Sequence, residues 1–139
     1  MPTVLYAEDD SDHQAMVRMA LKNTNITLIE ALDGLEALQK IQGQSPDLIL
    51  LDLFMPRLDG FRVMEAVKAN PRTRHIPIVV VSAWPTGDNR KRTREAGAIE
   101  FIVKPYEPVH LVKRIQEILA AQASLVPVKP KEDTAPFSA

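Results

Sequence analysis

Residues 47–52 read Asp-Leu-Ile-Leu-Leu-Asp, an apolar run that begins and ends with an aspartate. A second run, at 76–82, reads Ile-Pro-Ile-Val-Val-Val-Ser. Short runs without polar alternation are typical of strands that are buried on both faces, as in a parallel sheet covered by helices. These two stretches therefore predict the centre of an α/β fold.

Three further strand-like runs, at 3–7, 26–30 and 98–103, alternate with longer segments whose apolar residues recur every three or four positions. That recurrence indicates helices with one buried face. It is clearest at 111–119, and in the first helix it includes Met16 and Met19. A helix at 88–96 has few apolar residues, so we expect it to pack loosely. The alternation predicts a doubly wound, flavodoxin-like (βα)5 sandwich with five parallel strands in the order 2-1-3-4-5.

Polar residues at the expected helix ends agree with these boundaries. Ser11 or Asp12 is expected to cap the first helix and Asp59 the third, because their side chains can accept hydrogen bonds from free backbone N–H groups. Gly97 is expected to end the fourth helix, since glycine tolerates the left-handed conformation that often closes a helix.

The chain has 139 residues, enough for one domain, which we place at residues 1–122. Residues 123–139 contain three prolines, so we expect a flexible tail there rather than a docking segment. Little sequence is then left for a separate output domain.

Composition limits the classes of function. A formal net charge of -1 argues against nucleic acid held by bulk charge, and the absence of cysteine excludes disulfides and a thiol nucleophile. No apolar run is long enough to span a bilayer and the first residues do not resemble a signal peptide, so we expect a cytoplasmic protein without a membrane partner. His13, His75 and His110 share no metal-ligand spacing and are expected at the surface.

Polar residues gather where the predicted strands end. In chain order they are Glu8, Asp9, Asp10, Asp52, Ser82 and Lys104. Taken singly, the first acids could simply cap a helix and Asp52 could form a turn. However, the carboxyl ends of parallel strands meet at one edge of a sheet, where α/β proteins bind their ligands. Carboxylate oxygens at such an edge suit Mg²⁺, and a lysine side chain is long enough to reach Asp52.

Asp52 in this setting is suited to attack a phosphorus atom and form an aspartyl phosphate. The metal ion and Lys104 would neutralise phosphoryl charge. The Ser82 hydroxyl could donate a hydrogen bond to a phosphoryl oxygen and draw the loop after the fourth strand inward. The sequence therefore predicts a binary switch rather than a substrate pocket.

Six short motifs follow one another in a definite order: Glu8-Asp9, Leu50-Leu51-Asp52, Met55-Pro56, Gly60, Val81-Ser82-Ala83 and Lys104-Pro105. Together they resemble the receiver domain of bacterial two-component response regulators, of the stand-alone, single-domain type. The resemblance covers about residues 3–121. Each motif alone is weak evidence, whereas their joint order and spacing are highly specific.

The resemblance implies roles for the metal-site residues. Asp52 is the phosphoacceptor, with Mg²⁺ or Mn²⁺ as the cofactor. Asp9 would bind the metal directly and Glu8 through water, while Asp52 and the backbone carbonyl of Phe54 complete the protein ligands.

The resemblance also implies how phosphorylation would be sensed and passed on to a partner protein. Lys104 and Ser82 would contact the phosphoryl group, Lys104 would precede a cis peptide bond, and Phe101 would turn inward when Ser82 contacts phosphate. A histidine kinase or phosphotransfer protein would supply the phosphoryl group, and a downstream protein would read the fourth helix, fifth strand and fifth helix. We expect a monomer or a weak dimer through the same surface, with no turnover of an external substrate and so no enzymatic activity.

Two positions differ from the best-known members of the family. Phe54 lies two residues after Asp52, and Trp84 lies two residues after Ser82, where the family often has polar side chains. Neither can orient water. We therefore expect a long-lived phosphorylated form, shielded by these two apolar groups.

Two other functions compete with the switch. A phosphohydrolase would usually have a second aspartate where this chain has Phe54, and it would need a cap or substrate pocket. A scaffold that is never phosphorylated would have no physical need for Asp52, Ser82 and Lys104. The basic residues at 90–94 most often form a solvated helix face, with a docking patch for an acidic partner as the alternative.

Overall fold

A computed structural model describes residues 1–124 and 135–136. Its parallel strands are β1 (Thr3–Ala7), β2 (Thr27–Ala31), β3 (Leu48–Leu51), β4 (Ile78–Ser82) and β5 (Glu100–Val103). Its helices are α1 (Ser11–Leu21), α2 (Gly34–Gln44), α3 (Gly60–Ala69), α4 (Gly87–Glu95) and α5 (Pro108–Ser124). The strand order 2-1-3-4-5 and the fold class are as predicted. The strands depart by up to two residues from the expected bounds.

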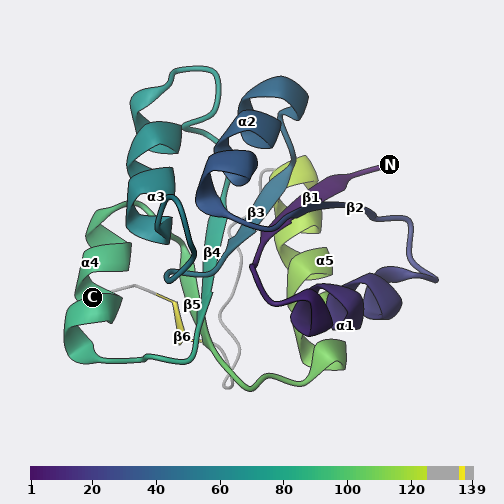
Figure 1. The fold of residues 1–139 in the computed structure, drawn as a ribbon. Helices are drawn as coiled ribbons and strands as arrows, with labels where there is room; N and C mark the ends of the chain where they lie inside the picture. Colours follow the sequence, from purple (N-terminus) through teal and green to yellow (C-terminus); the bar gives the residue numbers. More distant parts are fainter. Residues whose placement is uncertain (125–134, 137–139) are drawn as a thin grey trace.

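The helices form a layer on each face of the sheet, with α1 and α5 on one side and α2, α3 and α4 on the other (Figure 1). Alternate residues of β3 point to opposite faces of the sheet and pack against the two helix layers. Ile49 and Leu51 pack in the core under α2 and α3, whereas Leu48 and Leu50 pack in the core under α1 and α5. All four are fully buried, which explains why this stretch has no polar alternation.

The buried face of α1 differs from the predicted one. Gln14, Val17 and Leu21 face the core, while Met16 and Met19 are 37% and 75% exposed. The Gln14 side-chain amide donates to three buried carbonyl oxygens, those of Tyr6, Glu8 and Ala31, at 2.8, 3.2 and 3.1 Å. A glutamine therefore occupies a core position because it satisfies backbone acceptors, which an apolar pattern could not reveal.

The helix caps are partly as predicted. Asp59 caps α3 by accepting from the backbone N–H of Arg62, as expected. The prediction for α1 was wrong, because the cap is Asp10 and not Ser11 or Asp12. Asp10 has an extended backbone and accepts from the N–H groups of the second and third residues after it.

Helix α4 has the thin apolar face that its sequence predicts, since the residues it buries are Asn89 and Thr93. Gly97 ends it as expected, with a φ of 104°. The N–H groups of Gly97 and Ala98 donate to the carbonyl oxygens of Arg94 and Thr93, at 3.1 and 3.0 Å. These two nested hydrogen bonds form a Schellman motif, a helix ending that favours glycine at the left-handed position.

The end of the chain holds two features that the sequence did not predict. Helix α5 continues to Ser124, two residues past the predicted domain boundary, and Ala135–Pro136 form a short strand, β6, antiparallel to β5. Residues 125–134 and 137–139 of the expected tail lie outside the described residues, so its flexibility stays a prediction. In the described ranges, no helix has both the length and the apolar character needed to cross a membrane.

Candidate functional site

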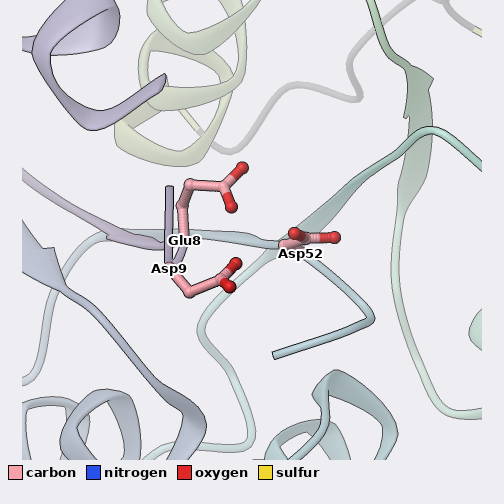
Figure 2. A group of neighbouring side chains, drawn as sticks. All are labelled: Glu8, Asp9 and Asp52. Carbon is pink, nitrogen blue, oxygen red and sulfur yellow. The ribbon is translucent and has the colours of Figure 1, made fainter. Parts of the chain in front are cut away.

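Three carboxylates meet at the carboxyl edge of the sheet. Glu8 and Asp9 directly follow β1, Asp52 directly follows β3, and these strands pair in parallel. One oxygen from each side chain lies within 4.8 Å of the other two. Figure 2 shows the carboxylates of Glu8 and Asp9 extending to the side where Asp52 lies. Glu8 and Asp52 are buried and Asp9 is exposed, so the cluster opens to solvent on one side.

Lys104 reaches this cluster from the end of β5, and its peptide bond to Pro105 is cis as expected. Its ammonium group contacts Oε1 of Glu8 and lies 3.5 Å from Oδ2 of Asp52. The predicted approach of Lys104 to Asp52 is thus present, and the contact with Glu8 was not predicted. Glu8 is the closer one, because its extra methylene lets the carboxylate reach the ammonium.

The cluster perturbs the ionisation of its own members. Burial and the Glu8 carboxylate raise the pKa of Asp52 to about 6, despite the opposing effect of Lys104. Burial also favours neutral Glu8, but the hydrogen bond and charge of Lys104 outweigh it and lower the pKa of Glu8 to about 2. The pKa of Lys104 is raised because both carboxylates outweigh its burial. Three carboxylates and one ammonium thus leave an excess of negative charge at neutral pH.

Sequence reasoning missed three residues that adjoin this cluster. His13 was expected at the surface, but its Nδ1 lies 3.1 Å from Oε1 of Glu8 and 3.4 Å from Nζ of Lys104. The Tyr6 hydroxyl donates to the same Glu8 oxygen at 3.2 Å and lies 3.3 Å from the Tyr106 hydroxyl. No spacing rule links these side chains. They converge because α1 and the loop after β5 fold back over the end of β1.

Ser82 and Phe101, the two expected switch residues, are both buried, on β4 and β5. Ser82 ends β4 and is fully buried, and its Oγ accepts a hydrogen bond from the Trp84 backbone N–H at 3.1 Å. Phe101 on β5 is 1% exposed, and the Arg90 guanidinium from α4 lies 4.9 Å from the centre of its ring. The aromatic ring is therefore already inside, in contact with the helix that follows Ser82.

The side chains of the two apolar residues near the site are exposed to solvent. Phe54 is 49% exposed and Trp84 is 62% exposed. The Phe54 backbone N–H lies 3.5 Å from Oδ1 of Asp52, which places this backbone at the site. A role for its carbonyl in binding a metal stays a prediction, as does the shielding of a phosphoryl group by these side chains.

The chain matches the family model of the response regulator receiver domain over residues 4–116. It belongs to this family. It is 37% identical to the transcriptional regulatory protein PrrA of Mycobacterium tuberculosis over 123 residues, which is 88% of this chain and 52% of that protein. The chain thus spans about half the length of PrrA.

Solved receiver structures share its fold. The chemotaxis response regulator CheY4 of Vibrio cholerae is 30% identical with a TM-score of 0.79, over 85% of this chain and 98% of that one. The Mn²⁺-bound form of response regulator Rcp1 is 29% identical with a TM-score of 0.74, over 94% of this chain and 100% of that one. The similarity therefore extends over the whole αβ sandwich, including the carboxyl edge of the sheet.

Gly60 holds the loop after Asp52 in this receiver domain. Its N–H donates to the Leu53 carbonyl at 2.8 Å, and an added Cβ would lie 2.6 Å from the Asp52 carbonyl oxygen. The Leu53 Cα would lie 2.8 Å from the same Cβ, and both of these close neighbours are backbone atoms, so the loop itself would have to move. We expect Gly60→Ala to lower the free energy of unfolding by about 1–3 kcal/mol.

Denaturant unfolding monitored by circular dichroism measures this change. Gly43→Ala is the matched control, because a Cβ at Gly43 in α2 would meet nothing within 4 Å. That control should gain stability, by about 0.5–1 kcal/mol. Equal stabilities for the two variants would contradict the close packing of Gly60.

Proposed function

We propose that the chain is a phosphorylation-dependent signalling switch, in which Asp52 accepts a phosphoryl group from a histidine kinase or a phosphotransfer protein. The observation that supports this most is the meeting of Glu8, Asp9 and Asp52 at one sheet edge with the Lys104 ammonium beside them. The chain would act as its own phosphoacceptor and turn over no external substrate.

The donor set fits Mg²⁺ or Mn²⁺. All three candidate ligands are carboxylate oxygens, which hard divalent cations prefer, and the excess negative charge favours a cation. Glu8, Asp9 and Asp52 would hold the ion, together with the Phe54 carbonyl. The metal found in the related Rcp1 structure agrees with this choice. When bound, it would supply positive charge to neutralise phosphoryl oxygens.

The transfer step needs little from the protein beyond position and charge. A carboxylate oxygen of Asp52 would form the new bond to phosphorus as the bond from phosphorus to the donor nitrogen breaks, and the donor imidazole would keep the electron pair. Asp52 must be ionised to attack. With a pKa of about 6 it is largely ionised above neutral pH. Lys104 would offset the charge of the phosphoryl oxygens from its position beside Asp52.

The readout would begin at Ser82. Its hydroxyl oxygen accepts from the Trp84 N–H, so turning the hydroxyl to a phosphoryl oxygen would disturb that hydrogen bond and the loop that leads into α4. Phe101 and Arg90 would transmit the change to the surface of α4 and β5. We propose that a downstream protein, or a weakly bound second copy, reads the surface formed by α4, β5 and α5.

Trp84 fluorescence tests this proposal, because Trp84 is the single tryptophan and lies beside Ser82. Mg²⁺ should change the emission once, and beryllofluoride, which mimics a phosphoryl group, should change it again. The second change should be lost in Asp52→Asn. A mimic-dependent change that persists in this variant would count against an Asp52-centred switch.

A further inference from the structure

Two tyrosine hydroxyl groups form a short chain that ends on the Glu8 carboxylate. Tyr6 on β1 is fully buried, and its hydroxyl donates to Oε1 of Glu8 at 3.2 Å. The Tyr106 hydroxyl, from the loop after β5, lies 3.3 Å from the Tyr6 hydroxyl. Neither hydroxyl has a part in the transfer step proposed for Asp52.

The geometry of β1 places Tyr6 on the same face of the sheet as Glu8. The Glu8 N–H donates to the Ala31 carbonyl of β2 at 3.0 Å, so the extended chain continues to this residue. Residues two apart in an extended chain point to the same face, which here is the face covered by α1 and α5. Tyr106 packs against the core on that face as well. The three side chains therefore meet on one face of the sheet.

The direction of these hydrogen bonds follows from the number of protons. An ionised carboxylate can only accept, so the single hydroxyl proton of Tyr6 is committed to Glu8. The Tyr6 oxygen must then accept from Tyr106, whose hydroxyl is the donor. The order is therefore Tyr106 to Tyr6 to Glu8. A hydrogen bond that ends on a charged group is strengthened by the one before it, so each tyrosine helps to fix the carboxylate.

The loop after β5 reaches the same carboxylate oxygen by a second route. Lys104 contacts Oε1 of Glu8 directly, and its ammonium lies 3.5 Å from Oδ2 of Asp52. Tyr106, two residues later, reaches that oxygen through Tyr6. The side chains of Lys104 and Glu8 are 12% and 2% exposed, so water can replace a lost donor only poorly. The position of Glu8 thus sets where the ammonium lies relative to Asp52.

We propose that Tyr6 and Tyr106 are positioning residues for phosphoryl transfer, which hold Glu8 against Lys104 and so keep the ammonium beside Asp52. This inference rests on the proposed function of Asp52 as the phosphoacceptor. Tyr106 acts through Tyr6, and Tyr6 acts through Glu8 and Lys104. A pair that served only for packing would affect the stability of the fold and leave the transfer rate unchanged.

Single-turnover phosphorylation by a small phosphodonor at saturating Mg²⁺ tests this order of action. Tyr6→Phe should slow uptake about tenfold, the lower end of the usual effect of losing a group that orients a metal ligand. Tyr106→Phe, one hydrogen bond further from Glu8, should slow it about threefold. The double variant should match Tyr6→Phe, because Tyr106 then has no hydroxyl to act through. In a Lys104→Ala background, Tyr6→Phe should have no further effect.

Thr73→Val is the matched control. It removes a buried hydroxyl that donates to the Val67 carbonyl at 2.9 Å, just before β4 and at the opposite edge of the sheet from Asp52, so it should leave the rate unchanged. Mg²⁺ affinity, followed by Trp84 fluorescence, should not fall in Tyr6→Phe, because all three carboxylates remain. A Tyr6→Phe rate equal to that of wild type, or losses that multiply in the double variant or in the Lys104→Ala background, would overturn the proposal.

Proton NMR of the metal-free protein tests the donor chain without phosphorylation. The Tyr6 hydroxyl proton should exchange slowly with water, because it is buried and bonded to a carboxylate. Its signal should disappear in Tyr6→Phe and shift in Tyr106→Phe. An unprotected Tyr6 hydroxyl, or the same Tyr6 signal in wild type and Tyr106→Phe, would overturn the proposal. If wild type took up no phosphoryl group, the proposed function would fail, while these signals would still decide whether the pair holds Glu8.

Discussion

Asp52→Asn is expected to take up no phosphoryl group from a small phosphodonor with Mg²⁺, while wild type takes up one. The amide is nearly the same size as the carboxylate, but it cannot act as the nucleophile. The fold should be unchanged, because the described contacts of the Asp52 side chain are with Lys104 and the Phe54 N–H. The backbone N–H of Asp52, which donates to the Ala7 carbonyl of β1, is not altered by the substitution. Intact-mass spectrometry measures the uptake.

The same variant should make the metal-free protein more stable at alkaline pH. The folded-state pKa of Asp52 is raised to about 6 from the ordinary aspartate value of 3.8, so ionised Asp52 costs stability above pH 6, and wild type gains stability as the pH falls through about 6. Asp52→Asn removes that cost. We expect a gain of about 1–3 kcal/mol at pH 8 in the presence of a chelator, shrinking toward zero below pH 4.

Denaturant unfolding at several pH values checks this. The matched control is Asp88→Asn, which replaces an exposed aspartate in the first turn of α4 and should not make the protein more stable at pH 8, because a carboxylate is favoured at a helix start. Phosphoryl uptake that persists in Asp52→Asn would contradict the assignment of the nucleophile. A variant less stable than wild type at pH 8 would contradict the electrostatic account of the site.

Lys104→Ala is expected to slow phosphoryl uptake by about 10²–10³-fold, the usual cost of losing a fixed group that stabilises charge in the transition state. It should not abolish metal binding, because the three carboxylates remain and the ammonium that competes for Glu8 is gone. Mg²⁺ affinity should therefore be equal to or higher than that of wild type. Single-turnover phosphorylation and a Mg²⁺ titration separate the two effects.

Lys113→Ala is the control for this change, since Lys113 is an exposed lysine on α5. It should leave both the rate and the metal affinity unchanged. If Lys104→Ala weakened Mg²⁺ binding and left the phosphorylation rate unchanged, the role of Lys104 would instead be to hold the carboxylates in position for the metal ion. The proposed role beside the phosphoryl group would then be wrong.

The strand order and the main site residues could be predicted because they depend on patterns that can be read directly from the linear sequence. The unbroken apolar runs at 48–51 and 78–81 are typical of strands buried on both faces. Once those strands are neighbours, the residues that follow them must share an edge. This argument located all the predicted residues at that edge: the acids that follow β1, and also Asp52, Ser82 and Lys104.

What the sequence did not predict depends on side chains that reach across elements. His13 and Tyr106 join the site through Glu8 and Tyr6, and no periodicity relates them. Gln14 faces the core because three carbonyl oxygens need a donor there. The β5–β6 pairing was missed for a similar reason, since two residues of which one is proline contain no strand signal.

The most direct test of the account is to find where the phosphoryl group goes. Wild type is incubated with Mg²⁺ and a small phosphodonor, the acyl phosphate is reduced with borohydride, and the modified residue is located by peptide mass spectrometry. We predict a single modification, at Asp52, that disappears when Mg²⁺ is chelated. Modification at another residue, or at Asp52 with equal yield in the presence of a chelator, would contradict the central claim.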